Sequence, residues 1–292
     1  MRRLLTARAW LWSSTCLGTL GFVGAAPAAD LGTGYSALAN GPLPAVSDVN
    51  GKLAAFAGSV GGQLAYGTSG SLAIPVGQRF GLQFDGMVGS AREALFYGVG
   101  GHAFWRDPSR GLIGLYGSYV GWDAMHSVGV ASPINGVADI TGGEVGKAAV
   151  EAEAYFGRVS LEGLLGYQFG TLSGVTGKAT VAFYPIDTLR LDTGVRYLNG
   201  QGTTWTAGAE WQPHGRAMSL FATGAFGGNG SLQALGGIKL YGGAKDKSLI
   251  QRHREDDPVD DLPANFFETI GPNHCPPGTT YFSDGNRCLN EG

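Results

Sequence analysis

The residues of this chain that could do chemistry are ionisable side chains that recur at every second position of short segments. Lys147, Glu151 and Glu153 alternate with small or apolar residues, and Glu162 follows in the next such segment. Acidic and basic groups gathered on one face of a wall can orient a solute, or they can pair into a salt-bridge network. The positions with this spacing are Asp85, Lys147, Glu151, Glu153, Glu162, Lys178, Arg190, Asp192, Arg196 and Glu210.

The segments that carry these residues have the period of β-strands. In the clearest pair, polar and apolar residues alternate from Lys147 to Phe156, a tight turn follows at Gly157-Arg158, and a second alternating segment reaches Phe169. A helix would need apolar residues every three to four positions. A tilted strand of about ten residues can cross a bilayer. The pattern is therefore typical of strands with lipid on one face and water on the other.

The same hairpin pattern repeats from Lys52 to Tyr241. Turn-like sequences at 77–80, 106–111, 157–158, 185–187 and 213–216 alternate with a second set of connections, which includes the longest one, 123–142. Two segments, 112–122 and 218–226, are apolar at both alternating sets of positions, so their facing is ambiguous. We predict an all-β fold, a closed antiparallel transmembrane β-barrel of about twelve strands, an even number as in bacterial barrels.

Composition narrows the class of function. Glycine accounts for 51 of 292 residues, charged residues are only 15%, and the formal net charge is −3. A nucleic-acid-binding protein needs a basic surface, so nucleic acid is not expected as a partner. After the N-terminal region, no run reaches the roughly 18 apolar residues of a transmembrane helix.

The N-terminal residues have the organisation of an export signal. Met1-Arg2-Arg3 precede an apolar run from Ala9 to Gly24, and Ala26-Pro27-Ala28 has the small residues of a cleavage site. An uncleaved membrane helix is the alternative, but the run is short for one. We therefore predict a signal peptide at 1–28, a periplasmic lead-in at 29–51, the barrel at 52–242 and a polar tail at 243–292.

Aromatic residues stand beside four of the turn-like sequences. They are Trp105, Phe156, Tyr184 and Trp211. Amphipathic rings settle at the interface of membrane and water, so these four are predicted to form a girdle at one end of the barrel. Chance is the alternative in a chain with 11% aromatic residues, but it does not explain their shared position relative to the turns.

With its export signal, hairpin series and aromatic residues, the chain resembles bacterial outer-membrane β-barrels of the porin-like type. The resemblance covers roughly Lys52 to Tyr241. It implies contact with outer-membrane lipid, insertion by the barrel assembly machinery and both chain ends in the periplasm. Such barrels usually end on a strand with a terminal aromatic residue. Here the segment ending at Tyr241 is followed by a long tail.

The tail is polar and contains several prolines. Its mixed-charge run from Lys245 to Asp257 is predicted to be solvated. Cys275 and Cys288 lie close together in an exported chain, which predicts one disulfide in an otherwise unfolded tail. Zinc is the alternative, but two cysteines and His274 are an incomplete ligand set. We expect no metal and no cofactor.

The function predicted first is passive diffusion of small polar solutes through a mixed-charge lumen. A structural or adhesive barrel with a closed, salt-bridged lumen is the alternative. A hydrolase is the weaker one, because it needs a nucleophile within reach of a base. The candidates for that pair are His102 with a nearby carboxylate, and His126-Ser127 in the long connection. We expect no enzymatic activity.

Overall fold

The computed structural model describes most of the chain after residue 42. The described residues are 43–60, 63–91, 94–123, 142–199, 202–213, 216–227, 232–256, 258, 262–264, 279–282 and 287–290. The predicted signal peptide and nearly all of the long 123–142 connection lie outside them. Cys275, His274, His126 and Ser127 also lie outside the described residues.

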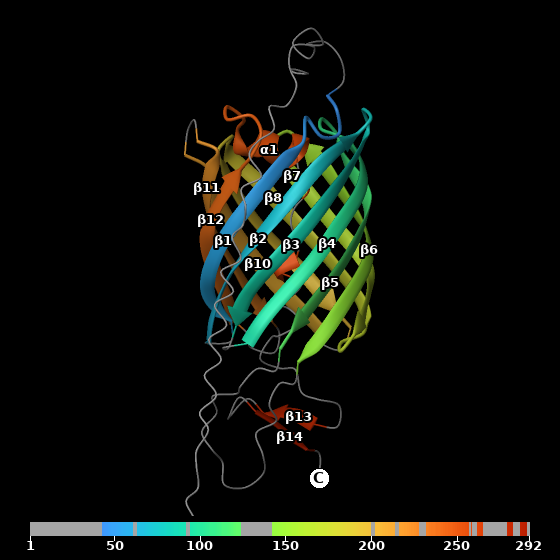
Figure 1. Cartoon of the computed structure of the whole chain (residues 1–292), viewed down its shortest axis with the longest axis vertical. Helices are drawn as coiled ribbons and strands as arrows, with labels where there is room; N and C mark the ends of the chain where they lie inside the picture. Colours follow the sequence, from blue (N-terminus) through green and yellow to red (C-terminus); the bar gives the residue numbers. More distant parts are fainter. Residues whose placement is uncertain are drawn as a thin grey trace, which may run out of the picture. The chain divides into compact units, whose positions relative to one another are not determined.

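Twelve antiparallel strands form a closed barrel, which confirms the predicted fold class (Figure 1). Each strand pairs with its neighbours in sequence, and β1 pairs with β12 to close the ring. The strands are β1 (Asn50–Val60), β2 (Gln63–Val76), β3 (Phe80–Ala91), β4 (Ala94–Asp107), β5 (Gly111–Trp122), β6 (Gly143–Phe156), β7 (Val159–Gly170), β8 (Gly174–Ile186), β9 (Leu189–Leu198), β10 (Gly202–Trp211), β11 (Met218–Gly227) and β12 (Leu232–Tyr241).

The barrel has two ends that differ in their connections. At the turn end, β1 begins, β12 ends, and tight turns join β2 to β3, β4 to β5, β6 to β7 and β8 to β9. Gly157, in the β6–β7 turn, has a φ of 55°, a conformation that glycine adopts without steric cost. At the opposite end, the loop end, the 20-residue connection 123–142 joins β5 to β6. Bacterial barrels have short periplasmic turns and longer outer loops.

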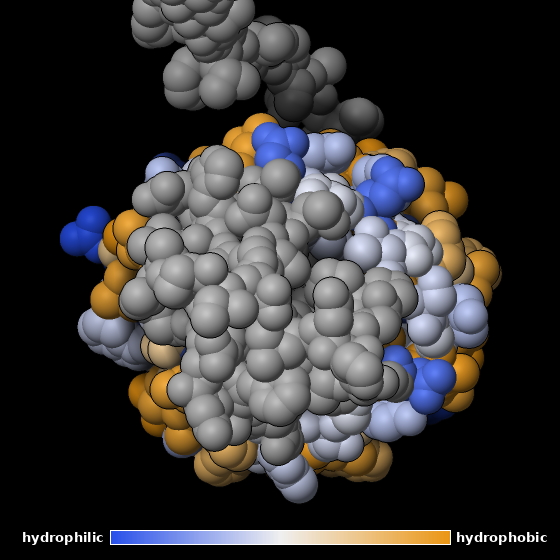
Figure 2. All heavy atoms as spheres, turned by 90° about the horizontal axis from the view of Figure 1, so that it is seen from below, coloured by the Kyte–Doolittle hydropathy of each residue, from blue (hydrophilic) through white to orange (hydrophobic). Residues whose placement is uncertain are grey.

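Side chains alternate between an apolar exterior and a mixed interior. Leu165 is 66% exposed and Leu115 is 64% exposed on the outer surface, whereas Glu151 and Glu162 are each 7% exposed on the inner one. Figure 2 shows apolar residues in orange around much of the outer rim. An apolar band of this kind is stable only against hydrocarbon or another apolar surface.

The strands β1 and β12 approach each other closely where the barrel closes. Their register runs from Lys52 opposite Tyr241 to Val60 opposite Gln233. A Cβ atom added at Gly58 would lie 2.0 Å from the carbonyl oxygen of Ala234, closer than any real contact. Glycine at this position therefore permits the two backbones to pair at the seam.

Two apolar clusters fill parts of the interior. One lies toward the turn end and joins Val46, from the segment before β1, to Ala73, Phe104 and Leu112. The other lies at the loop end and joins strand residues to Leu262 of the tail. These clusters explain the ambiguous facing of 112–122. Leu112, Tyr116 and Val120 point inward. Val46 packs in the cluster of Leu112, and Leu262 packs in the cluster of Val120.

The tail contains the short helix α1 (Leu249–Glu255), which lies at the turn end (Figure 1). Ser248 and Gln251 form a capping box at its start, which satisfies backbone donors that a helix leaves unpaired. The prediction of a solvated run over 245–257 was wrong for Leu249, Arg252 and Asp256, which are buried, whereas Lys245, Asp246 and Gln251 are exposed.

Farther along the tail, β13 (Thr279–Phe282) pairs with β14 (Arg287–Asn290) in a two-stranded hairpin. Cys288 belongs to β14, but its predicted partner Cys275 is not among the described residues. The disulfide therefore stays a prediction. Within the described part of the chain, no helix has the length and apolar character needed to span a membrane.

Candidate functional site

The ionisable residues predicted from the alternation of side chains lie in the lumen of the barrel. Most of them belong to two groups on opposite sides of it. The first group comes from β3, β4 and β6. The His102 Nδ1 atom lies 2.9 Å from the Glu151 carboxylate, and its Nε2 atom lies 3.0 Å from Asp85 Oδ2. Gln83 Nε2 donates to Asp85 Oδ1 at 2.8 Å. All four side chains are buried, so this side of the lumen is filled.

The arrangement around His102 does not favour hydrolysis. A histidine acting as a general base needs one ring nitrogen directed at a hydroxyl or thiol nucleophile. Here each ring nitrogen contacts a carboxylate, and the ring packs 4.6 Å from the ring of Tyr116. His102 therefore links the carboxylates of Asp85 and Glu151 and does not activate a nucleophile.

The second ionic group comes from β7, β9, β10 and β12. Arg190 binds Glu162 through two nitrogen–oxygen contacts of 2.9 and 3.2 Å, and its Nε atom lies 3.1 Å from Asp192. Two parallel contacts of this kind fix the orientation of the guanidinium. The pairing holds the Arg190 side chain against the wall, so this group leaves space beside it.

Glu210 is the acceptor for several elements at once. Its carboxylate accepts hydrogen bonds from the Lys239 ammonium and from the hydroxyls of Ser219 and Tyr241. The His253 Nε2 atom of α1 lies 3.7 Å away from it. Because a buried carboxylate needs several donors, Glu210 ties β10, β11, β12 and the helix together.

A cavity of about 210 Å³ lies beside the second group. Its wall includes five lysine and arginine residues, three acidic residues and threonine hydroxyls, and the tail contributes Pro258, Pro263 and Ala264. The charged wall residues are Lys52, Glu162, Lys178, Arg190, Asp192, Arg196, Glu210 and Lys239. The wall is mixed, since these charged groups and hydroxyls alternate with apolar residues such as Phe56, Phe221 and Leu235. Its charged groups can hold water or a small polar solute.

Helix α1 is attached to the turn end of β6–β9 by direct contacts. The Arg254 guanidinium donates to the carbonyls of Gly157 at 2.8 Å and Val159 at 3.0 Å, and it stacks over the ring of Tyr155 at 4.8 Å. The backbone N–H of Ile250 donates to the carbonyl of Asp187 at 3.1 Å. The helix therefore occupies the mouth of the lumen.

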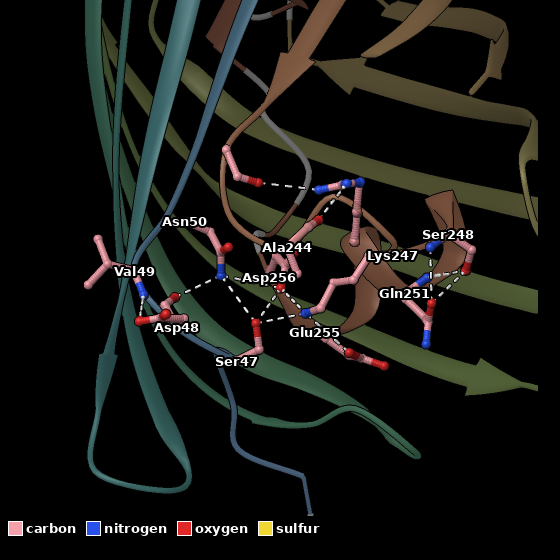
Figure 3. A network of polar contacts seen from close by, with 12 residues as sticks. Ser47, Asp48, Val49, Asn50, Ala244, Lys247, Ser248, Gln251, Glu255 and Asp256 are labelled. Carbon is pink, nitrogen blue, oxygen red and sulfur yellow. Dashed lines mark hydrogen bonds and ion pairs between the residues drawn. The ribbon is translucent and has the colours of Figure 1, made fainter. Parts of the chain in front are cut away.

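The segment before β1 meets the tail at the same mouth (Figure 3). Lys247 Nζ donates to Ser47 Oγ at 2.7 Å and also contacts Asp256. Ser47 Oγ donates to Asp256 Oδ1 at 2.7 Å, and Asn50 donates to the same oxygen at 3.2 Å. These contacts join residues about two hundred positions apart and close the ring of polar groups around the mouth.

His253 is largely enclosed at the contact between the helix and the wall, with 12% of its side chain exposed. Its Nδ1 atom lies within hydrogen-bond distance of the Tyr184 hydroxyl, at 2.9 Å. Burial lowers the pKa of His253 well below its usual range; the Glu210 carboxylate opposes this, and the nearby Arg190 adds to it. The helix is therefore held by a neutral histidine.

The structure places all ten predicted lumen residues on the inner face of the barrel wall. Asp85, Lys147, Glu151, Glu162, Arg190 and Glu210 are buried, and the other four are partly buried. Six of the ten line the cavity, whereas Asp85 and Glu151 belong to the filled side. Glu153 accepts a hydrogen bond of 2.7 Å from Tyr155.

The predicted aromatic girdle needs one correction. Trp105, Phe156 and Trp211 lie on the outer surface and are 36%, 61% and 47% exposed. Tyr184, however, is 1% exposed and points into the lumen toward His253. The reason is parity, because Phe183 is the neighbour of Tyr184 that faces outward, at 45% exposure.

Sequence reasoning missed the tail residues that contact the lumen. Arg252, His253 and Arg254 are all on α1, in a run that composition alone assigns to solvent. The available signal was the capping box of Ser248 and Gln251, followed by Leu249 and Ile250. Among the described residues, no group of three or more His, Cys, Asp or Glu side chains has the arrangement of a metal site.

Comparisons with known proteins give matches only among solved structures. No protein-family model matches the chain, and no curated protein matches it. A KdgM porin covers 65% of this chain and 98% of its own, at 9% identity and a TM-score of 0.49. Outer membrane phospholipase A from Escherichia coli covers 68% and 98%, at 12% identity and 0.45. The translocator domain of autotransporter NalP from Neisseria meningitidis covers 67% and 87%, at 13% identity and 0.41.

The closed ring of twelve strands, the apolar exterior and the ionic interior define the class of this protein. It is a closed antiparallel β-barrel of the transmembrane type. Such an exterior requires a lipid environment, and in bacteria antiparallel barrels of this construction lie in the outer membrane.

Proposed function

We propose that the barrel is a porin-like channel for passive diffusion of small polar solutes, and that its C-terminal segment narrows the passage. The observation that supports this most is the ionic cavity of about 210 Å³ between the tail and the wall of β7–β12 and β1. Charges of both signs on facing walls orient a dipolar or ionic solute while leaving it mobile.

The size of the cavity sets the class of solute. It holds several water molecules, so the passage suits small polar solutes and inorganic ions rather than oligomers. The side of the lumen around His102 contributes no path, because its side chains contact one another directly. Conduction therefore depends on residues such as Lys178, Arg196 and Asp192.

Conductance of the refolded full-length chain in planar bilayers tests this function. We expect small, ohmic conductance steps. Arg196→Gln should shift the ratio of anion to cation permeability toward cations, because it removes a positive charge from the cavity wall. Asp246→Asn is the matched control, since Asp246 is exposed and outside the cavity. A silent bilayer with protein that shows heat-modifiable migration would overturn the proposal.

A structural barrel with a closed lumen is the second candidate. It is supported by the filled side around His102 and by the helix in the mouth. The same bilayer experiment separates the two functions, because a scaffold folds and stays silent. For either function we propose outer-membrane lipid and the barrel assembly machinery as partners, since an apolar exterior must be inserted with assistance and then covered.

A further inference from the structure

The tail leaves the barrel wall at one end and enters the lumen at the same end. After β12 ends at Tyr241, the N–H of Gly242 donates to the carbonyl of Gly51 at 2.6 Å, next to the start of β1. Gly243 has a φ of 72°, which turns the chain. The contacts of α1 with Gly157 and Asp187 then hold the tail at the turn end.

Asp256 is still at the turn end, because it contacts Ser47 and Asn50 just before and at the start of β1. Leu262 is not. It is fully buried in the apolar cluster of the loop end, together with Val60, Trp122 and Val145. Val60 is the last residue of β1 and Trp122 the last of β5, so this cluster marks the far end of the strands.

Six Cα-to-Cα steps lead from Asp256 to Leu262, and they suffice because the loop-end cluster extends along β1 to Phe56, six residues after Asn50. An extended chain spans at most about 3.3–3.6 Å per residue, or roughly 20 Å over six residues. Pro258, before Leu262, and Pro263, directly after it, line the lumen cavity. Proline has no backbone N–H, so a proline-containing segment brings fewer donors that need partners inside the barrel.

We propose that the lumen is a conduit for the chain's own C-terminal segment, which emerges at the loop end. The 28 residues after Ala264 (292 − 264) include the β13–β14 hairpin. They would be displayed on the side of the membrane opposite the turns and opposite the end where β12 stops. If the longer connection faces outward, as in bacterial barrels, this side is the cell surface.

The proposal differs from the expectation that both chain ends lie in the periplasm. That expectation counts strands, and an even number returns the chain to its starting side. It does not take the tail into account. The contacts of Leu262 with the loop-end cluster indicate that the tail crosses the membrane again, through the lumen. The inference does not depend on solute passage, because a silent barrel can display a tail equally well.

Epitope accessibility in intact cells tests the topology of the full-length chain. One version carries an epitope after Gly292, and a second carries it in the β4–β5 turn beside Ser109. We expect antibody to label the C-terminal epitope on intact cells, and the turn epitope only after the outer membrane is permeabilised. Labelling in the reverse pattern also supports the proposal, since the two epitopes would still lie on opposite sides. Both epitopes on one side would overturn it.

A pair of tail variants tests the role of the loop-end cluster. Leu262→Asp puts a carboxylate among apolar side chains, so we expect loss of the surface signal of the C-terminal epitope. Ala264→Asp is the matched control, because Ala264 lines the ionic cavity, and it should keep the signal. Heat-modifiable migration confirms that both barrels fold. An unchanged surface signal in Leu262→Asp would contradict the crossing as described.

Discussion

The two sides of the lumen accommodate buried charged side chains in different ways. Around β3–β6, the carboxylates of Asp85 and Glu151 meet His102 directly, and Val46 packs on Phe104 nearby. Around β7–β12, the charged groups pair along the wall, as Arg190 does with Glu162, and a cavity remains. One side is filled by the His102 ring, the Tyr116 ring and the apolar cluster around Val46, and the other stays hollow beside small residues such as Gly208, Thr223 and Ala225.

The comparison shows that the size of the inward side chains, rather than the amount of charge or the direction of pairing, distinguishes the filled side from the hollow one. Buried charges are retained only where they find partners. Glu151 of β6 reaches His102 of β4 across one intervening strand, and Glu162 of β7 reaches Arg190 of β9 in the same way. The reach of the pairs is therefore equal on the two sides, and the cavity lies where the neighbouring inward side chains are small.

Removal of His102 should produce the largest effect on stability. His102→Leu leaves two buried carboxylates without their shared partner, and breaking a buried pair costs about 3–5 kcal/mol. We expect a marked fall in the urea concentration at the midpoint of unfolding, measured by tryptophan fluorescence in detergent. Adding Asp85→Asn and Glu151→Gln to the variant should restore most of it. Equal midpoints for wild type and His102→Leu would show that the filled side is not held by this contact.

Insertion of a large side chain on each side sharpens the comparison. Ala73→Phe overfills the apolar cluster of Val46, Phe104 and Leu112, and overpacking typically costs about 1–3 kcal/mol. Ala225→Phe projects into the cavity and should leave stability nearly unchanged. Conductance should respond in the opposite order, with a loss for Ala225→Phe. Similar unfolding midpoints for the two variants would contradict the division into filled and hollow sides.

Loss of the Arg254 contacts should have a smaller effect, confined to the hollow side. Arg254→Met keeps much of the side-chain length but removes the hydrogen bonds to Gly157 and Val159. Hydrogen bonds from charged groups are worth about 1.5–3 kcal/mol, partly offset here by the retained packing. We expect faster cleavage of the tail by added protease and a wider conductance step. The unfolding midpoint of the strands should not move. A lower strand midpoint would mean that α1 supports the wall itself.

Acidification should give the smallest effect. Burial lowers the pKa of His253 in the docked helix below the usual value of about 6.5. The undocked tail therefore binds the proton more tightly, and docking loses stability as the pH falls below about 6.5. Protease cleavage of the tail should be faster near pH 5 than near pH 7.5. His253→Gln should remove the difference. The charged groups facing this histidine from the wall are Glu210, Arg190, Lys239 and Lys52.

A pH-independent cleavage rate in the wild-type chain would show that His253 does not couple the helix to proton binding. The measurement needs the barrel intact across the range. Heat-modifiable migration at each pH provides that control.

The strands were predictable because lipid selects one face of every strand. Alternation identified the hairpin from Lys147 to Phe169 and the inward direction of Glu151 and Arg190. Alternation failed where the interior is apolar too, as around Leu112 and Val120, because it cannot detect segments that pack inside the ring.

The contents of the lumen were less predictable, since they depend on contacts between distant residues. Nothing near Lys247 in the sequence indicates that its partner Ser47 lies 200 positions away. Nor does the order of residues near Tyr184 reveal that its hydroxyl pairs with a histidine of the tail. The alternation of residues along a strand predicts the barrel wall well. It carries little information about which residues of the two flanking segments pack inside the barrel.

The contact of Ser47 with Asp256 indicates at which stage of barrel assembly the tail can dock. The mouth that receives the helix is built from residues just before and at the start of β1 and from strands late in the ring, including Glu210 of β10 and Lys239 of β12. The part of this surface formed by Ser47, Asn50 and Lys239 is assembled only when β12 pairs with β1. We therefore expect the tail to complete its contacts only after the ring has closed.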